Sequence, residues 1–324
     1  MNSKRFGSKI LAAGVALGLS LPLLAQAADV TVATTAIVEH PALDAVRDGV
    51  RDELKANGFE EGKNLTFIYK SAQGNPATAA QIAREYVGDA PDVIVPIATP
   101  SAQAVVAATK DIPIVFSAVT DPVAAKLVAD EEASGTNVTG VSDLSPIDQH
   151  IALIKELTPD AKTIGVPYNP GEANSVVLLD LVKKHGEAAG YKVIESPATK
   201  TGEVLTAAQN LIGQADVIYV ATDNTIISAF EAVVKVGVEN QIPVYAGDTD
   251  SVKRGAMAAL GFDYYDVGRQ TGKIVVDILN GKNAGDIAFQ GVSKTNLFVN
   301  PAMATKMGVT LSDEVIARAT EVVE

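Results

Sequence analysis

The stretch Asp92-Val-Ile-Val-Pro-Ile-Ala-Thr-Pro-Ser-Ala-Gln103 contains the pattern on which the predicted architecture depends. Its apolar run stops abruptly at Thr99-Pro100-Ser101, where the threonine can cap a helix and the proline suits the first helical position. A second stretch, Asp216-Val-Ile-Tyr-Val-Ala-Thr-Asp-Asn224, has nearly the same form 124 residues later. Continuous apolar runs of this kind are typical of buried strands in parallel sheets. The sequence therefore predicts two units of the same kind, each a buried strand that ends in small polar residues.

Strand-like and helix-like segments alternate on both sides of these two stretches. In the first half, strands are expected at 30–38, 65–70, 93–98 and 114–119, and helices at 42–57, 77–87 and 100–109. In the second half, strands are expected at 163–168, 192–196, 217–221 and 244–246, and helices at 173–189, 203–212 and 225–239. A late helix is expected at 265–279. This order predicts the α/β fold class, with parallel sheets covered by helices on both faces.

Two similarly built lobes are predicted. Residues 112–121 resemble residues 242–250, and the order of segments also matches between the halves. A chain of this length exceeds what one hydrophobic core usually supports. The segment 140–146, with a glycine, small polar residues and a proline, is interpreted as a crossover between the lobes. The expected first lobe is 28–143 plus about 250–282, and the expected second lobe is 144–249 plus about 283–324.

The first 27 residues have the layout of a secretory signal peptide. Lys4, Arg5 and Lys9 precede an uncharged, mostly apolar run at 10–24, and an A-x-A cleavage site follows at 25–27. The run of 15 residues is short for a membrane span, which needs about 20. The chain has no cysteine, so it can form neither a disulfide nor a lipidated N-terminal cysteine. We expect an exported, periplasmic protein that is not a lipoprotein.

The charge balance is strongly acidic. The formal net charge is −13, and cleavage after Ala27 would remove three positive charges and no negative ones, leaving −16. An acidic surface repels phosphate backbones and anionic lipids. The composition therefore argues against nucleic-acid partners and membrane-surface roles.

Small polar and acidic groups follow most of the predicted strands, and no basic residue does. In open parallel sheets, ligands bind beyond the carboxyl ends of the strands. The helix N-termini at these ends suit a carboxylate, and the aspartates suit an ammonium group. A phosphate or dicarboxylate site would favour a bidentate arginine instead. The pattern therefore favours a zwitterionic ligand, with one or two aromatic residues available to line an apolar pocket.

Enzyme motifs are largely missing. The three histidines, His40, His150 and His185, lie far apart in sequence, and the last two are expected on helix surfaces. The chain contains no H-E-x-x-H, P-loop or G-x-G-x-x-G motif. Acids distributed over two lobes fit a clamp that closes on a ligand. We expect no catalytic residue, no metal and no cofactor.

The motifs that follow the strands resemble those of the periplasmic substrate-binding proteins of ABC importers, in the family that includes tryptophan- and tyrosine-binding members. The resemblance covers residue 29 to about residue 311. Its motifs are the segments 37–44, 97–103, 115–122, 137–143, 168–175, 222–224, 246–251 and 264–270. Pro167, in the strand before Tyr168, departs from the family pattern, so ligand identity is not copied from relatives.

The resemblance implies a type I periplasmic-binding-protein fold with two Rossmann-like lobes and a hinged cleft. It implies a monomeric receptor, not an enzyme, that delivers a small molecule to an inner-membrane ABC permease driven by a separate ATPase. An amino acid with an aromatic or large apolar side chain is favoured. A sugar, a nucleoside or another small polar ligand is the alternative, and an α/β enzyme is a weaker one.

The resemblance also implies a set of ligand-binding residues. Thr99, Ser101 and Gln103 would contact the ligand from the first lobe, and Asn174, Ser175 and Asp223 from the second. Asp121 and Asp248 would lie near the ammonium group. Glu39 and Tyr168, beside the same strand ends, complete the candidate residues.

Overall fold

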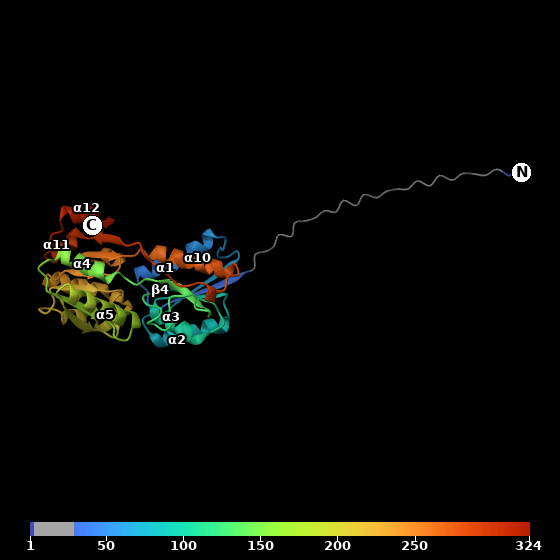
Figure 1. Cartoon of the computed structure of the whole chain (residues 1–324), viewed down its shortest axis with the longest axis horizontal. Helices are drawn as coiled ribbons and strands as arrows, with labels where there is room; N and C mark the ends of the chain where they lie inside the picture. The colour runs from blue at the N-terminus through green and yellow to red at the C-terminus, as the bar shows by residue number, and fades with distance from the viewer. Residues whose placement is uncertain (3–28) are drawn as a thin grey trace.

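The computed structural model describes residues 1–2 and 29–324, so the expected signal peptide falls almost wholly outside the described residues. The described chain forms two lobes that lie side by side (Figure 1). Each lobe contains one sheet, of six strands in the first and seven in the second. No described helix combines the length and the apolar character that a membrane crossing requires.

The first lobe is built around a parallel sheet with the strand order β2-β1-β3-β4-β5-β11. Its elements are β1 (Val30–Ala36), α1 (Pro41–Ala56), β2 (Leu65–Ser71), α2 (Pro76–Asp89), β3 (Val93–Ile97), α3 (Thr99–Ala108), β4 (Ile114–Val119), β5 (Val138–Ser142), α10 (Tyr264–Leu279), η2 (Ala284–Asp286) and β11 (Gln290–Gly291). All side chains of β3, β4 and β5 are buried, as expected for central parallel strands.

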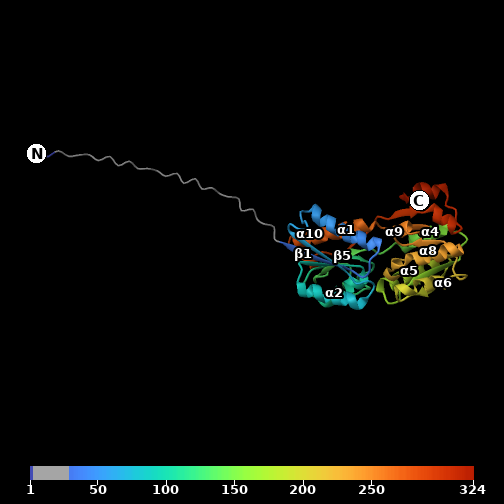
Figure 2. The same ribbon diagram turned by 180° about the vertical axis from the view of Figure 1, so that it is seen from behind.

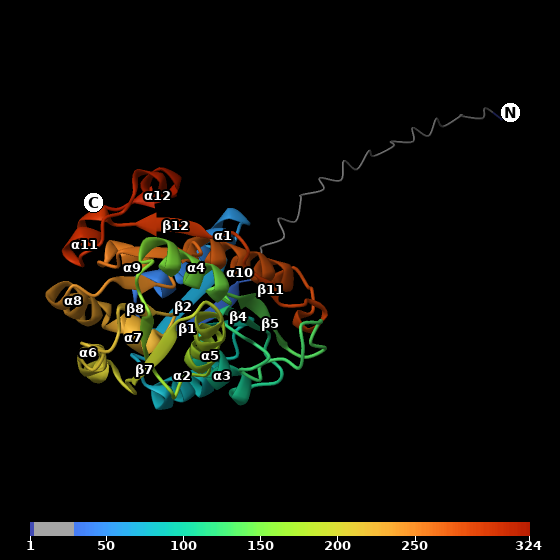
Figure 3. The same ribbon diagram turned by 60° about the vertical axis from the view of Figure 1, so that its left-hand side comes forward.

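The second lobe repeats this order as β7-β6-β8-β9-β10, with β12 and β13 added at the far edge. Its elements are α4 (Ile147–Leu157), β6 (Thr163–Tyr168), α5 (Ala173–Ala188), β7 (Lys192–Pro197), η1 (Thr201–Glu203), α6 (Val204–Gln209), β8 (Val217–Val220), α7 (Asn224–Ser228), α8 (Phe230–Asn240), β9 (Val244–Ala246), α9 (Asp250–Lys253), β10 (Ala258–Gly261), β12 (Asn296–Val299), α11 (Pro301–Lys306), α12 (Asp313–Arg318) and β13 (Glu321–Val322). Only β12 runs antiparallel to its neighbour β10 among the described strands. Figure 3 shows α11 and α12 beside β12 at this edge.

The predicted α/β class and the two parallel-dominated sheets are confirmed. Strands β3 and β8, which form the apolar parts of the two stretches quoted first, occupy the same position in their sheets, and so do β4 and β9. Three local details differ from the prediction. Gly140–Ser142 belong to β5, and we propose that the first crossover is limited to Asp143–Pro146. Strands β10 and β12 were not predicted, and the helix expected at 225–239 is broken at Ala229 into α7 and α8.

The strand pairings show where the chain changes lobe. Strand β10 pairs with β9 in the second sheet, whereas Phe262 and Tyr264 belong to the first hydrophobic core. Strand β11 pairs with β5 in the first sheet, and β12 pairs with β10 in the second. We therefore propose that the later crossovers lie near residues 262 and 292, compared with about 250 and 282 from the sequence.

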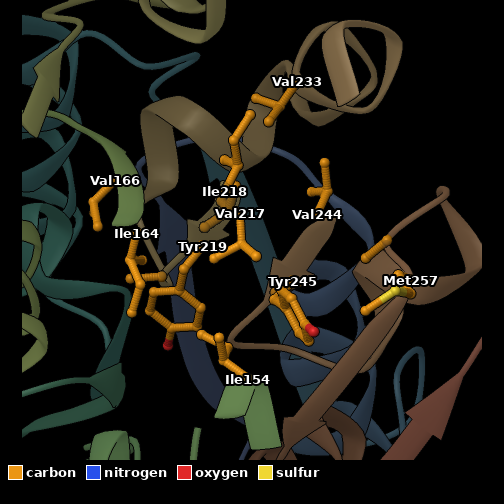
Figure 4. Close-up of a cluster of buried hydrophobic side chains, with 14 of the residues drawn as sticks. Ile154, Ile164, Val166, Val217, Ile218, Tyr219, Val233, Val244, Tyr245 and Met257 are labelled. Carbon is orange, nitrogen blue, oxygen red and sulfur yellow. The ribbon is translucent and has the colours of Figure 1, made fainter. Parts of the chain in front are cut away.

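The second core is continuous between its sheet and helices (Figure 4). The buried rings of Tyr219 and Tyr245 place their hydroxyls at its edge. The Tyr219 hydroxyl lies 2.6 Å from Nδ1 of His150, and the Tyr245 hydroxyl lies 3.0 Å from Oγ1 of Thr158. His150 was expected on the helix surface, and this was wrong. Its ring is buried, which lowers its pKa to about 4.

Helices α1 and α10 pack closely although about 200 residues separate them in sequence; Figures 1 and 2 show them side by side. Glycines permit this approach. A Cβ on Gly49 would overlap the carbonyl oxygen of Tyr265, and a Cβ on Gly268 would overlap the carbonyl oxygen of Val46. An ion pair of 2.6 Å between Arg269 and Glu53 also joins the helices. The late helix is therefore part of the first core.

Candidate functional site

A small cavity of about 20 Å³ lies between the two lobes. The lining residues lie at the carboxyl ends of parallel strands or in the loops and helices that directly follow them, which is where open α/β sheets bind ligands. The first lobe contributes His40, Ala42, Leu43, Ala98, Thr99, Ala118, Thr120, Asp143 and Tyr264, and the second contributes Asn174, Thr222, Asn224, Ile227 and Asp248.

Four buried polar atoms of the lining residues have no hydrogen-bond partner among the described residues. They are Nδ1 of His40 and Oγ1 of Thr99 in the first lobe, and Oδ1 of Asn174 and Oγ1 of Thr222 in the second. A buried polar group without a partner costs about 1–3 kcal/mol, so such groups mark sites that a ligand can complete. Because each lobe supplies two of them, a small polar ligand could join the lobes.

Two buried carboxyl groups face this cavity, one from each lobe. Asp143 accepts hydrogen bonds from Thr120 at 3.3 Å and from the Tyr264 hydroxyl at 2.7 Å. Asp248 accepts from the backbone N–H of Ser251 at 2.9 Å and from its hydroxyl at 2.6 Å. Burial raises the pKa of both aspartates above the ordinary value. A cationic group placed between them would favour their ionised forms.

Two alanines that line the cavity have backbone conformations uncommon for residues with a Cβ. Ala98, directly before α3, has φ +70°, and Ala118, near the end of β4, has φ +52°. The pairing of β4 with β5 shifts register beside Ala118. Strained backbone of this kind costs about 1–3 kcal/mol and is concentrated at functional sites. Here it shapes the two strand ends that form the first-lobe wall.

A second buried carboxyl pair lies behind the second-lobe wall. Asp223 accepts from the N–H of Asn169 at 2.6 Å, from the N–H of Ile226 at 2.9 Å and from the Ser175 hydroxyl. Glu172 accepts from the side chain of Asn224 at 2.6 Å. Burial, together with the negative charge of Glu172, raises the pKa of Asp223 to about 7. This network holds Asn224 in the cavity wall.

The raised pKa of Asp223 predicts a pH-dependent contribution to stability. Its ionised form is disfavoured in the folded state, so the cost is full above pH 7 and is relieved as the pH falls towards the ordinary value of 3.8. From about pH 8 to about pH 6, wild type should therefore gain about 1 kcal/mol relative to Asp223→Asn, which lacks this titration. Thermal unfolding of both proteins over this range measures the difference. The buried histidines titrate in both and cancel; a difference that stays constant with pH would contradict the prediction.

Three of the candidate residues from the sequence line the cavity: Thr99, Asn174 and Asp248. Ser101 is buried two residues beyond Thr99, and its hydroxyl has no partner among the described residues. Ser175 and Asp223 are buried and bind each other behind the wall.

The other four candidates are Gln103, Asp121, Tyr168 and Glu39, and the structure places them outside the cavity wall. Gln103 is exposed and donates to the Ala125 carbonyl at 3.2 Å, and Asp121 accepts the N–H groups of its own turn. Tyr168 donates to Glu195 at 3.1 Å, and Glu39 is exposed. None of these four lines the cavity.

Asp143 and Tyr264 line the cavity but were not among the candidates. Asp143 directly follows β5, which the sequence analysis interpreted as a crossover, so its position at a strand end was not recognised. Tyr264 follows β10, a strand of four residues that was not predicted. Recognising β5 and β10 in the sequence would have identified both residues, because a polar residue becomes a site candidate only when the strand before it is recognised.

A larger cleft of about 560 Å³ lies between the lobes and shares Asn224 with the inner cavity. The loop at 73–76 and Pro100 line it from the first lobe, and the loop at 199–202 lines it from the second. Asn224 therefore lies between the inner cavity and this cleft.

Comparison with known proteins identifies relatives along almost the whole described chain. A family model described as ABC transporter substrate binding protein matches residues 31–323. A tyrosine-binding protein of Clostridioides difficile strain R20291 is 42% identical over 264 residues, which are 82% of this chain and 76% of that protein.

Two solved structures match the fold of this chain to different degrees. An ABC domain of Streptococcus pneumoniae in complex with L-Trp is 33% identical, covers 91% of this chain and 100% of its own, and has a TM-score of 0.88. The ligand-free, open structure of an adhesive substrate binding protein from Clostridium difficile is 41% identical, covers 90% and 99%, and has a TM-score of only 0.68. The lower score at higher identity indicates a different arrangement of the two lobes. Of these two structures, the L-Trp complex is the more similar to the present one overall.

Proposed function

The chain belongs to the family of ABC transporter substrate-binding proteins, and we propose that it is the periplasmic receptor of an importer for an aromatic or large apolar amino acid. The family consists of solute-binding receptors rather than enzymes. The observation that carries the ligand class is the cavity between the lobes, where two acids and four unpartnered polar atoms meet small apolar side chains. The relatives that bind tyrosine and L-Trp support the same class.

The mechanism we propose is closure of the lobes around the ligand. Hydrogen-bonding atoms from both lobes can be satisfied together only when the lobes approach each other, so a bound ligand favours the closed arrangement. Asp143 and Asp248 would hold the ammonium group. The first turn of α3, with the Thr99 and Ser101 hydroxyls and free backbone N–H groups, would hold the carboxylate. A membrane permease with a separate ATPase would then accept the ligand from the closed form.

Export and cleavage after Ala27 are part of the same proposal. We propose a freely diffusing monomer, and the absence of a cysteine that could carry a lipid supports the proposal that it is not a lipoprotein. Fractionation of producing cells, followed by N-terminal sequencing, tests this point. A mature protein that begins at Ala28 in the periplasmic fraction would support it, and an intact leader on a membrane-bound protein would contradict it.

Thermal unfolding with each of the standard amino acids, several sugars and several nucleosides tests the ligand class. A ligand that binds only the folded state stabilises it, by about 2.7 kcal/mol at a ligand concentration of 100 times the Kd. This stabilisation raises the melting temperature. We expect the largest shift with an aromatic amino acid. A shift with a sugar or nucleoside, and none with any amino acid, would overturn the proposed ligand class. Protein freed of bound ligand by unfolding and refolding is the required starting material.

A further inference from the structure

His40 lines the cavity, and its side chain does not cap the helix that follows it. It lies between β1 and α1, where it precedes the first helical residue, but its side chain makes no capping hydrogen bond. Only its backbone carbonyl serves the helix, accepting the N–H of Asp44 at 3.0 Å. The ring is 7% exposed, and Nδ1 has no partner among the described residues. The imidazole is therefore available to a ligand.

The imidazole is neutral at physiological pH. Burial, and secondarily the positive charge of Arg254, lowers the pKa of His40 to about 3. A neutral imidazole has one donor and one acceptor nitrogen. It therefore suits a neutral hydroxyl or N–H group better than a carboxylate, which would prefer a cation.

Apolar side chains from both lobes line the cavity together with His40. Ala42 and Leu43 line the cavity beside it from the first turn of α1. Arg254, whose charge reaches His40, donates to the carbonyl of Ile227 at 2.8 Å, and Ile227 also lines the cavity. Ile227 therefore belongs to the second-lobe wall of the cavity that His40 also lines. Ala42 and Leu43 thus give the ring apolar neighbours in a cavity that also contains polar groups, and a side-chain pocket combines these two kinds of lining.

We infer that His40 selects the side chain of the ligand by hydrogen bonding to a phenol hydroxyl or an indole N–H, and that it thereby disfavours phenylalanine. The inference rests on the proposed function, because it concerns the side chain of an aromatic amino acid. A site built to hydrogen-bond a substrate group rejects the analogue that lacks it, since the buried partner is left unpaired. Phenylalanine would fill the same apolar space and leave His40 without a partner.

Titration calorimetry with L-tyrosine, L-tryptophan and L-phenylalanine tests this inference. We expect wild type to bind tyrosine or tryptophan about tenfold or more tightly than phenylalanine. His40→Leu removes both ring nitrogens and should abolish that preference while keeping phenylalanine affinity within about threefold. His40→Asn keeps a polar atom near the position of Nδ1 and should retain part of the preference. His185→Leu, a half-buried histidine on α5 outside the cavity, is the matched control and should leave all three affinities unchanged.

The possible results separate this inference from the proposed function. Equal wild-type affinities for tyrosine, tryptophan and phenylalanine would overturn the role of His40 and leave an aromatic amino-acid receptor. A uniform loss of all three ligands in His40→Leu would also overturn it, because it would assign His40 to the shared carboxylate or ammonium group. Binding of none of the three by refolded wild type would instead count against the proposed function.

Discussion

Asp248→Asn should weaken binding of an amino acid by about 100-fold or more, equivalent to about 2.7 kcal/mol. Asp248 is almost fully buried in the second-lobe wall, where Ser251 supplies its two hydrogen bonds. Truncating one partner of a buried, hydrogen-bonded charge pair typically costs 2–5 kcal/mol. The asparagine keeps the shape of the side chain and the possibility of bonding to Ser251, but it cannot neutralise an ammonium group.

Asp250→Asn is the matched control for this prediction. It lies two residues away at the start of α9, and it does not line the cavity. Titration calorimetry of both variants at one pH gives the comparison. An Asp248→Asn affinity within threefold of wild type, or an equal loss in both variants, would remove Asp248 from the ammonium site. Asp143→Asn should behave like Asp248→Asn, since Asp143 is the corresponding acid of the first lobe.

Gly268→Ala should lower the free energy of unfolding by about 3 kcal/mol, at the upper end of typical overpacking costs. The new Cβ would overlap the carbonyl oxygen of Val46 and lie 2.9 Å from its Cα. Both atoms belong to the backbone of α1, so no side chain can rotate away. The two helices would have to separate, and the packing of α1 against α10 would be lost along its length.

Gly88→Ala is the control for the effect of the substitution itself. Gly88 lies in the last turn of α2, and a Cβ there would meet no atom within 4 Å. Alanine is the better helix former by about 1 kcal/mol, so this variant should be unchanged or slightly more stable. Urea unfolding followed by circular dichroism measures both. If Gly268→Ala matched Gly88→Ala in stability, the close approach of α1 and α10 would be incorrect.

The regular parts of the fold could be predicted because their hydrophobic patterns are strong and local. The central strand at 93–97 is an uninterrupted apolar run, the strand at 114–119 is interrupted only by Ser117, and the helices at 41–56 and 264–279 have clear apolar faces. Strand β5 was missed because Thr139 and Gly140 interrupt its apolar character. It is nevertheless buried throughout, since β4 and β11 flank it. Its pairing is a tertiary contact that no local pattern contains.

The site was predictable in outline and not in detail. The rule that ligands bind at the carboxyl ends of parallel strands placed Thr99, Asn174 and Asp248 in one cavity. It could not separate side chains that face the cavity from those that stabilise it, because both kinds follow strands. Asp223 illustrates this limit, since its carboxylate is occupied by Asn169, Ser175 and Ile226. The burial of His150 likewise depends on Tyr219, which is 69 residues away.

The packing of α10 against α1 has a consequence for when each lobe can fold. Residues 30–142 leave the ribosome long before Tyr264–Leu279, yet the first core contains buried side chains from both segments. The first lobe therefore stays incomplete until more than four fifths of the chain has been synthesised. The second sheet is completed later still, by β12 and β13. Late contacts between distant segments delay folding. If the protein is exported as proposed, that delay would keep the chain unfolded while it passes through a translocation channel that admits only unfolded polypeptide.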